Sequence, residues 1–270
     1  MTGRVQGRVA LITGAARGQG RSHAVRLAEE GADLILTDIC GPVADLGYPA
    51  ARPEDLDETA ATAEAAGARV VRRRADVRQL NELTGAVNAG MDAFGRLDIV
   101  VANAGISAWG RLWEISELQW RDVLDTNLTG VWHTLKACAP PMIQAANGGS
   151  IITVSSVAGL KSLPGQAHYS AAKHGVVGLT GTAALELGPY GIRVNSIHPW
   201  AVDTPMASDE HLDVLLKEHG HYLASFGQIL GSPKIAEPRD VSDAVLWLAS
   251  DESRTVTGTA LPIDLGATSV

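Results

Sequence analysis

The chain reads Thr13-Gly14-Ala15-Ala16-Arg17-Gly18-Gln19-Gly20 directly after an apolar run at residues 9–13 and directly before an amphipathic stretch at residues 21–30. Three glycines allow a tight turn that brings the backbone close to a phosphate group, and the N-terminus of a helix attracts that charge. The spacing is GxxxGxG rather than the more general GxGxxG. The pattern predicts a strand, a glycine-rich turn and a helix, although a glycine-rich turn alone can also be purely structural.

The remainder of the chain repeats this alternation of apolar and amphipathic segments. The predicted strands, most of them apolar runs, lie at residues 9–13, 33–38, 70–74, 97–102, 150–155, 193–198 and 260–264. Amphipathic runs of helix length lie at residues 21–30, 54–66, 80–94, 117–138, 169–187 and 241–249. Such alternation is typical of a parallel sheet with helices on both faces. We predict one doubly wound, Rossmann-type α/β domain over residues 1–270, with seven strands in the order 3-2-1-4-5-6-7.

Bulk composition excludes several classes of partner. The 270 residues carry a formal net charge of -8 without a long basic block, so we expect no nucleic-acid or membrane partner. No apolar run approaches the roughly 20 residues of a membrane-spanning helix. We expect a cytoplasmic protein in which the two cysteines, Cys40 and Cys138, stay reduced. His211, His219 and His221 lack a supporting carboxylate pattern, and we expect no metal site.

Two connecting segments are longer than usual. Residues 39–53 follow the second predicted strand, and residues 199–237 follow the sixth. Both segments leave the carboxyl ends of strands, where ligands of open α/β sheets bind. We expect the insertion at 39–53 to lie near the adenosine of a bound nucleotide, either as a lid or as a passive surface excursion. We expect residues 199–237 to form the substrate-binding loop or lid.

Asp38 indicates which dinucleotide the turn would bind. It ends the second predicted strand, where an acid that binds the adenosine ribose should lie. A carboxylate there accepts a hydrogen bond from the ribose 2'-hydroxyl and repels a 2'-phosphate. No basic residue follows directly, since the next residue is Ile39. The pattern favours NAD over NADP, the alternative being a merely solvated acid at a strand end.

Tyr169 and Lys173 form a candidate pair for proton transfer. They are four positions apart at the start of a predicted helix, so both side chains can lie on one face. A phenol has a pKa of about 10, and a nearby ammonium group lowers that pKa. Ser155 and Ser156 end an apolar strand, and Ser156 can hold a reacting oxygen beside the phenol. Each of these residues also has ordinary structural uses, because a YxxxK pair is common on helix surfaces and serines cap turns.

Taken together, several stretches resemble the short-chain dehydrogenase/reductase family along nearly the whole chain. They are residues 13–20, 103–105, Asn127, Ser156, 169–173 and 199–204, in this chain order. The resemblance implies that Ser156, Tyr169 and Lys173 are catalytic and that Asn127 completes a tetrad through a water-bridged relay to Lys173. Ser156 rather than Ser155 has the family spacing to Tyr169. The resemblance also implies a homotetramer.

The same resemblance assigns cofactor contacts. The expected contacts are Gly14, Arg17, Gly18, Gln19, Gly20, Asp38, Ile39, Asp76, Val77, Asn103, Ala104, Gly105, Tyr169, Lys173, Pro199, Val202 and Thr204. Many family members have Pro-Gly after the sixth strand, whereas this chain has Pro199-Trp200. A large indole there narrows the space near the nicotinamide end.

A closer resemblance is to the carveol-dehydrogenase-like branch associated with mycofactocin. It is carried by the length of the 39–53 insertion, by His-Tyr-Ser-Ala-Ala-Lys-His at residues 168–174 and by Asp-Thr-Pro-Met at residues 203–206. This resemblance implies an NAD that does not exchange readily and electrons that leave to an external carrier of the mycofactocin type.

Apolar side chains are expected around the substrate. The predicted pocket residues are Ile106, Trp109, Leu163, Trp200 and Met206, although tryptophans in loops often serve local packing. We predict an NAD-dependent oxidoreductase that interconverts an apolar secondary alcohol, carveol-like or another cyclic alcohol, and its ketone, with Tyr169 as general acid and base. Two alternatives stay open, namely a ketoreductase of the 3-oxoacyl or steroid type and a catalytically silent nucleotide-binding protein.

Overall fold

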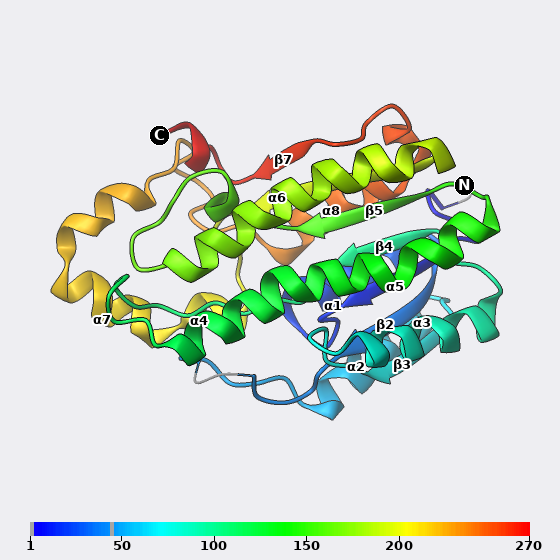
Figure 1. Cartoon of the computed structure of the whole chain (residues 1–270), viewed down its shortest axis with the longest axis horizontal. Helices are drawn as coiled ribbons and strands as arrows, with labels where there is room; N and C mark the ends of the chain where they lie inside the picture. The colour runs from blue at the N-terminus through cyan, green and yellow to red at the C-terminus, as the bar shows by residue number, and fades with distance from the viewer. Residues whose placement is uncertain (1–2, 44–45) are drawn as a thin grey trace.

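The computed structural model describes residues 3–43 and 46–270, and its centre is a seven-stranded sheet (Figure 1). The strands are β1 (Val9–Thr13), β2 (Asp33–Asp38), β3 (Val70–Arg74), β4 (Ile99–Ala102), β5 (Gly149–Val154), β6 (Ile192–Pro199) and β7 (Ala260–Ile263). Their order is β3-β2-β1-β4-β5-β6-β7, and every neighbouring pair is parallel. The predicted sheet and strand order are confirmed.

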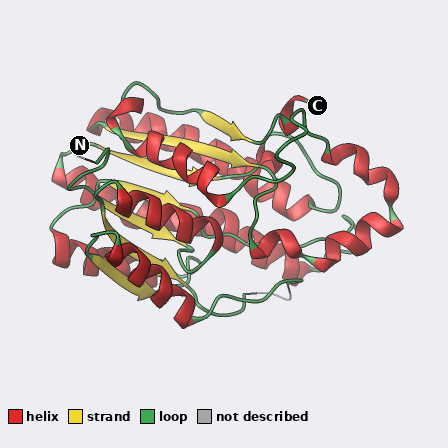
Figure 2. Ribbon diagram, turned by 180° about the vertical axis from the view of Figure 1, so that it is seen from behind, coloured by secondary structure: helices red, strands yellow, loops and turns green. Residues whose placement is uncertain are grey.

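Helices cover both faces of this sheet (Figure 2). They are α1 (Gly18–Glu29), α2 (Pro53–Ala65), α3 (Leu80–Phe94), α4 (Glu117–Leu124), α5 (Gly130–Ala145), α6 (Ala167–Leu187), α7 (Glu210–Glu218) and α8 (Pro238–Ala249). Side chains of α1, α2 and α8 share one buried apolar cluster, and side chains of α3, α5 and α6 share another. The two clusters lie on opposite faces, as expected of a doubly wound domain.

The alternation of side chains along β1 shows how one strand serves both cores. Ile12 belongs to the cluster under α1 and α8, whereas Leu11 belongs to the cluster under α3, α5 and α6. Both side chains are fully buried. Burying a leucine or isoleucine contributes about 1.5–3 kcal/mol, and continuous apolar strands such as β1 therefore require a helix layer on each side.

One predicted helix is wrong. The amphipathic run at residues 117–138 predicted a single helix, but α4 and α5 are separated by a π-helical turn at Asp125–Thr129, and α5 continues past two prolines to Ala145. The wide turn directs Asn127 into the protein, where its amide group bonds the Ile106 backbone. A π turn inserts one extra residue into the helical repeat, which a simple period does not reveal.

Helix α1 also begins three residues earlier than predicted, at Gly18.

The two long segments extend beyond the carboxyl ends of the strands. Figure 1 shows the segment that carries α7 beyond the arrowheads of β5 and β7, and the blue segment after β2 on the same side of the molecule. Within the predicted 199–237 segment, α7 and a 3-10 helix at Gly220–Phe226 give most of the regular structure. Of the predicted 39–53 insertion, residues 44–45 lie outside the described residues.

Within the described residues, no helix combines the length and the hydropathy needed to cross a bilayer. The same part of the chain brings no three His, Cys, Asp or Glu side chains together in a way that could hold a metal ion.

Candidate active site

A cavity of about 560 Å³ opens at the carboxyl ends of the strands. All seventeen residues predicted to contact the cofactor line it, from the glycine-rich turn at one end to Thr204 at the other. All five residues predicted for the substrate pocket line the same cavity. Of the predicted tetrad, Ser156, Tyr169 and Lys173 line the cavity, and Asn127 lies behind its wall. One continuous space therefore joins the two predicted binding regions.

The glycine-rich turn has a backbone that only glycine adopts easily. Gly14 and Gly18 have φ values of +66° and +55°. A Cβ atom at Gly20 would lie 1.9 Å from the Gly14 carbonyl oxygen, so no larger residue fits there. The N-cap residue of α1, Arg17, makes no side-chain capping bond. The first amide groups of α1 are thus available to a phosphate, as the sequence predicts.

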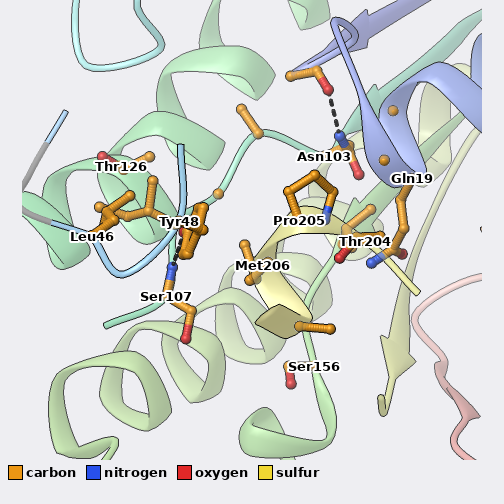
Figure 3. A pocket seen from close by; sticks show the side chains of 18 of the residues that line it. Gln19, Leu46, Tyr48, Asn103, Ser107, Thr126, Ser156, Thr204, Pro205 and Met206 are labelled. Carbon is orange, nitrogen blue, oxygen red and sulfur yellow. Dashed lines mark hydrogen bonds between the residues drawn. The ribbon is translucent and has the colours of Figure 1, made fainter. Parts of the chain in front are cut away.

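Asn103 holds the turn against the end of β4. Its side-chain amide donates to the carbonyl oxygens of Thr13 and Gly14 at 2.9 and 3.1 Å, and its backbone amide donates to Thr13 Oγ1 at 3.0 Å. Figure 3 shows Asn103 beside Gln19 and Thr204 in the cavity wall. Asn103 therefore holds the glycine-rich turn and the end of β4 at a fixed separation.

Asp38 is fixed at the end of β2. One carboxylate oxygen accepts from the Ala16 amide at 3.1 Å, and the other accepts from the Cys40 amide at 2.9 Å. Cys40 has a φ of +48°, so the chain turns sharply where the insertion begins. Each oxygen keeps one lone pair free for a ligand hydroxyl. The placement matches the expected contact with a ribose.

Tyr169 and Lys173 lie one helical turn apart at the start of α6. Lys173 Nζ is 5.4 Å from the centroid of the Tyr169 ring and donates to the Val154 carbonyl oxygen at 2.9 Å. Ser156 follows β5, lines the same cavity as Tyr169 and lowers the pKa of the phenol. All three side chains are buried. The sequence thus brings together a phenol, an ammonium group and a hydroxyl from two different elements.

Burial dominates the ionisation of this group. It raises the pKa of Tyr169 to about 12, which the nearby Ser156 hydroxyl opposes, and it lowers the pKa of Lys173 to about 8. The expectation that Lys173 brings the pKa of the phenol below its ordinary value is therefore wrong for the protein alone. Removing two ionisable groups from water has the larger effect at this site.

Asn127 is held by the π turn that the sequence did not predict. Its Nδ2 donates to the Ile106 carbonyl oxygen at 2.7 Å, and its Oδ1 accepts from the Ile106 amide at 2.8 Å. A Cβ atom at Gly105 would lie 2.9 Å from Asn127 Oδ1 and 3.5 Å from Lys173 Nζ. Asn127 and Lys173 therefore approach the same point of the chain, with Gly105 leaving room between them.

The far half of the cavity is mainly apolar. The centroid of the Phe226 ring lies 6.0 Å from that of Trp109 and 6.1 Å from that of Trp200. The indole of Trp200 donates to Gln228 Oε1 at 3.1 Å, so the residue that replaces the expected glycine is anchored to a later part of the same segment. Tyr169 belongs to the apolar cluster against which Trp200 and Phe226 pack, and Figure 3 shows Met206 lying between Tyr48 and Ser156 in the view.

The two long segments contact each other over this half. A Cβ atom at Gly47 would lie 2.0 Å from Asp209 Oδ1, so the insertion closely approaches the residue that caps α7. Leu46 packs against the cluster that contains Tyr169. The insertion therefore begins beside Asp38 and reaches the substrate half as well.

Comparisons with known proteins agree with this geometry. A family model described as enoyl-(acyl carrier protein) reductase matches residues 14–268. An uncharacterized NAD-dependent oxidoreductase of Mycobacterium tuberculosis is 54% identical, over 98% of this chain and 97% of its own. A (-)-trans-carveol dehydrogenase of Rhodococcus erythropolis is 48% identical, over 98% and 99%. The crystal structure of a short-chain dehydrogenase from Mycobacterium paratuberculosis bound to NAD has a TM-score of 0.97 at 47% identity, over 99% and 100%.

This chain belongs to the short-chain dehydrogenase/reductase family. The resemblance stated from the motifs is thereby confirmed, and a carveol dehydrogenase is among the relatives.

Sequence reasoning missed several residues of this short-chain dehydrogenase/reductase site. Tyr48, Ser107, Gln166 and Phe226 all line the cavity. Gln166 lies three positions before Tyr169, so its proximity to the tyrosine was a usable signal. Tyr48 and Phe226 lie in the two long segments, and only their aromatic character in a polar stretch could have indicated them.

Proposed function

We propose that this chain is an NAD-dependent oxidoreductase that interconverts an apolar cyclic secondary alcohol and its ketone. The observation that carries the proposal is the position of Ser156, Tyr169 and Lys173 in one cavity, with a glycine-rich turn at one end and an apolar pocket at the other. An alcohol oxygen beside Tyr169 would then be next to the nicotinamide end of a dinucleotide that lies along the crevice.

The residues of the crevice fit NAD. Gln19 Oε1 and Thr126 Oγ1 line it, are buried and have no hydrogen-bond partner within the described residues. Buried polar atoms normally have a partner, and a bound nucleotide would supply one. Asp38 would bind the adenosine ribose and disfavour a 2'-phosphate, while the turn and the start of α1 would hold the pyrophosphate. NAD supplies the acceptor for the substrate hydride when it is bound.

The chain's own residues would handle the proton. Tyr169 takes the hydroxyl proton of the alcohol during oxidation and returns it during reduction. Ser156 holds the substrate oxygen beside the phenol, and Lys173 supplies positive charge near the phenolate that forms. Asn127 positions Ile106 and the π turn behind the site, and its carbonyl oxygen keeps a lone pair for the expected water relay.

The substrate class rests on the character of the walls. Ile106, Trp109, Leu163, Trp200 and Met206 surround the far half, which suits a compact apolar ring. The similarity to a carveol dehydrogenase supports a cyclic alcohol. Asp38 favours oxidation, because it selects the cofactor whose cellular pool is generally the oxidising one.

Four further properties belong to this proposal: the first two follow from the branch resemblance, the third from the family resemblance, and the fourth from composition and cysteine content. NAD is retained under the insertion, electrons pass to an external carrier of the mycofactocin type, the protein is a homotetramer, and it works in the cytoplasm. The close approach of Gly47 to Asp209 supports retention, because both long segments must separate before a nucleotide beneath them can leave.

The test is nucleotide content followed by a substrate panel. We expect protein purified without added nucleotide to release NAD on denaturation, in an amount close to one per chain. With NAD, cyclic secondary alcohols such as carveol should be oxidised faster than 3-hydroxyacyl thioesters or hydroxysteroids. A chain that turns over only the acyl or steroid substrates is a ketoreductase, and one that binds NAD but turns over none of them is a silent binding protein.

A further inference from the structure

Three polar side chains interrupt the apolar wall of the substrate half. They are Tyr48 of the insertion, Ser107 of the loop after β4 and Gln166 at the start of α6, and all three are buried and line the cavity. Tyr48 Oη accepts from the Ser107 amide at 3.0 Å, and Gln166 Nε2 donates to Ser107 Oγ at 2.8 Å. Figure 3 shows Tyr48 and Ser107 joined by the first of these bonds. We call these three residues the polar wall.

The backbone holds the polar wall in place. The Gly110 amide donates to the Gly165 carbonyl oxygen at 3.0 Å, and Gly110 pairs with Gln166 in a short parallel bridge. These bonds tie the loop that carries Ser107 to the residue that precedes α6. The Tyr48 ring lies under the Arg17 guanidinium, with 5.9 Å between the guanidinium carbon and the ring centroid. The wall is therefore arranged before a substrate binds, which reduces the entropy lost on binding.

The polar wall has unused hydrogen-bonding capacity. Within the part of the chain that the structure describes, the hydroxyl protons of Tyr48 and Ser107 have no acceptor, and Gln166 Oε1 has no donor. Burial raises the pKa of Tyr48, and the nearby Tyr169 and Asp209 raise it further, while the Ser107 amide and Arg17 lower it. Tyr48 therefore stays protonated at neutral pH and remains a donor. A purely apolar ligand against this wall would leave two donors and an acceptor without partners or water.

We propose that Tyr48, Ser107 and Gln166 bind a second, uncharged oxygen of the substrate, and that the substrate is a cyclic diol or a hydroxylated cyclic ketone. This inference rests on the proposed function and names its substrate more closely. A hydroxyl group fits all three residues, because it accepts from Tyr48 or Ser107 and donates to Gln166 Oε1. A carboxylate could not donate to Gln166 Oε1, so it would leave this buried acceptor without a partner.

The first test uses wild-type protein loaded with NAD. Cyclohexanol and the positional isomers of cyclohexanediol are mixed with it, and the second-order rate constant for nicotinamide reduction is measured under single-turnover conditions. We expect the best diol to react at least about tenfold faster than cyclohexanol, since a site built for a hydroxyl discriminates against a ligand that lacks it. A carboxylated ring, such as 4-hydroxycyclohexanecarboxylate, should react more slowly than that diol.

The second test uses variants of the wall. Tyr48→Phe and, separately, Ser107→Ala each remove one donor, and we expect each to reduce the diol-to-cyclohexanol ratio of rate constants about tenfold. A purely structural role would slow both substrates together and leave this ratio unchanged. Tyr190→Phe is the matched control, because Tyr190 is half exposed and lies outside the cavity. Should Tyr48→Phe fail to fold, Ser107→Ala and the wild-type preference still decide the question.

The outcomes separate the two proposals. Equal rates for cyclohexanol and every diol in the wild type, an unchanged ratio in both variants, or a preference for the carboxylated ring would overturn the polar-wall inference while leaving the oxidoreductase intact. If no cyclic alcohol reduces bound NAD, the proposed function fails and this inference fails with it.

Discussion

The adenosine half and the substrate half of the cavity are built in different ways. The adenosine half consists of strand ends and the turn into α1, and its key contacts are backbone groups and short side chains such as Asp38 and Asn103. The substrate half is enclosed by two long segments that meet only in the folded protein, as the Gly47 backbone and the Asp209 side chain do. One half is therefore fixed by the sheet and the other by contacts between loops, so mutations should affect the two halves differently.

The largest expected effect lies where the two halves meet. Tyr169→Phe removes the phenolic proton carrier while keeping the ring that packs in the cavity, and we expect alcohol oxidation to fall about 10²- to 10⁴-fold. NAD affinity should change little, because the adenosine half is untouched. Steady-state kinetics and NAD titration check both statements, with Tyr190→Phe as the control. Activity close to wild type in Tyr169→Phe would show that Tyr169 does not carry the proton.

A smaller effect is expected within the adenosine half. Asp38→Asn removes the negative charge that faces the ribose, and we expect the preference for NAD over NADP to fall about 10- to 100-fold. The ratio of dissociation constants for the two nucleotides measures it. Asp33 lies at the opposite end of the same strand, where it pairs with Arg69. Asp33→Asn is therefore the control and should keep the wild-type ratio of dissociation constants. If Asp38→Asn and Asp33→Asn had the same ratio of dissociation constants, the proposed contact between Asp38 and the ribose would be contradicted.

The pH dependence tests the burial of Tyr169. Its pKa is raised to about 12, so at neutral pH the phenol is almost entirely protonated, and only a small phenolate fraction can act as base. Alcohol oxidation should therefore rise with pH, by up to about tenfold per unit below the phenol pKa, while ketone reduction should not rise. The rise should weaken above about pH 8, where Lys173 loses its proton. An oxidation rate that stays constant or falls between pH 6 and 8 would contradict the predicted direction of the pH dependence.

The smallest effect concerns the contact between the long segments. Gly47→Ala places a Cβ atom 2.0 Å from Asp209 Oδ1, and overpacking of this kind typically costs about 1–3 kcal/mol. We expect the insertion and the 199–237 segment to separate more often and NAD to leave several times faster after dilution. Gly231→Ala is the control, because nothing lies within 4 Å of the added atom. Unchanged NAD release in Gly47→Ala would mean that this contact does not retain the nucleotide.

The same contrast explains what the sequence could predict. The strands, their order and the crevice follow from local patterns, since apolar runs and glycine spacing act over a few residues. The π turn at Asp125–Thr129 could not be predicted, because the hydrogen bonds between Asn127 and Ile106 that stabilise it join residues far apart in the chain. Tyr48 was missed for the same reason, since its partner Ser107 lies 59 positions away. The raised pKa of Tyr169 depends on burial, which no spacing shows.

The most direct test of the central claim is the transfer of a labelled hydride. Protein loaded with NAD is mixed with a cyclic secondary alcohol that carries deuterium at the carbinol carbon, and the released nucleotide is analysed by mass spectrometry. We predict that the carbon–deuterium bond breaks, that deuterium with its electron pair appears on the nicotinamide ring, and that the alcohol becomes the ketone. Ketone formation with no deuterium in the nucleotide would contradict the account.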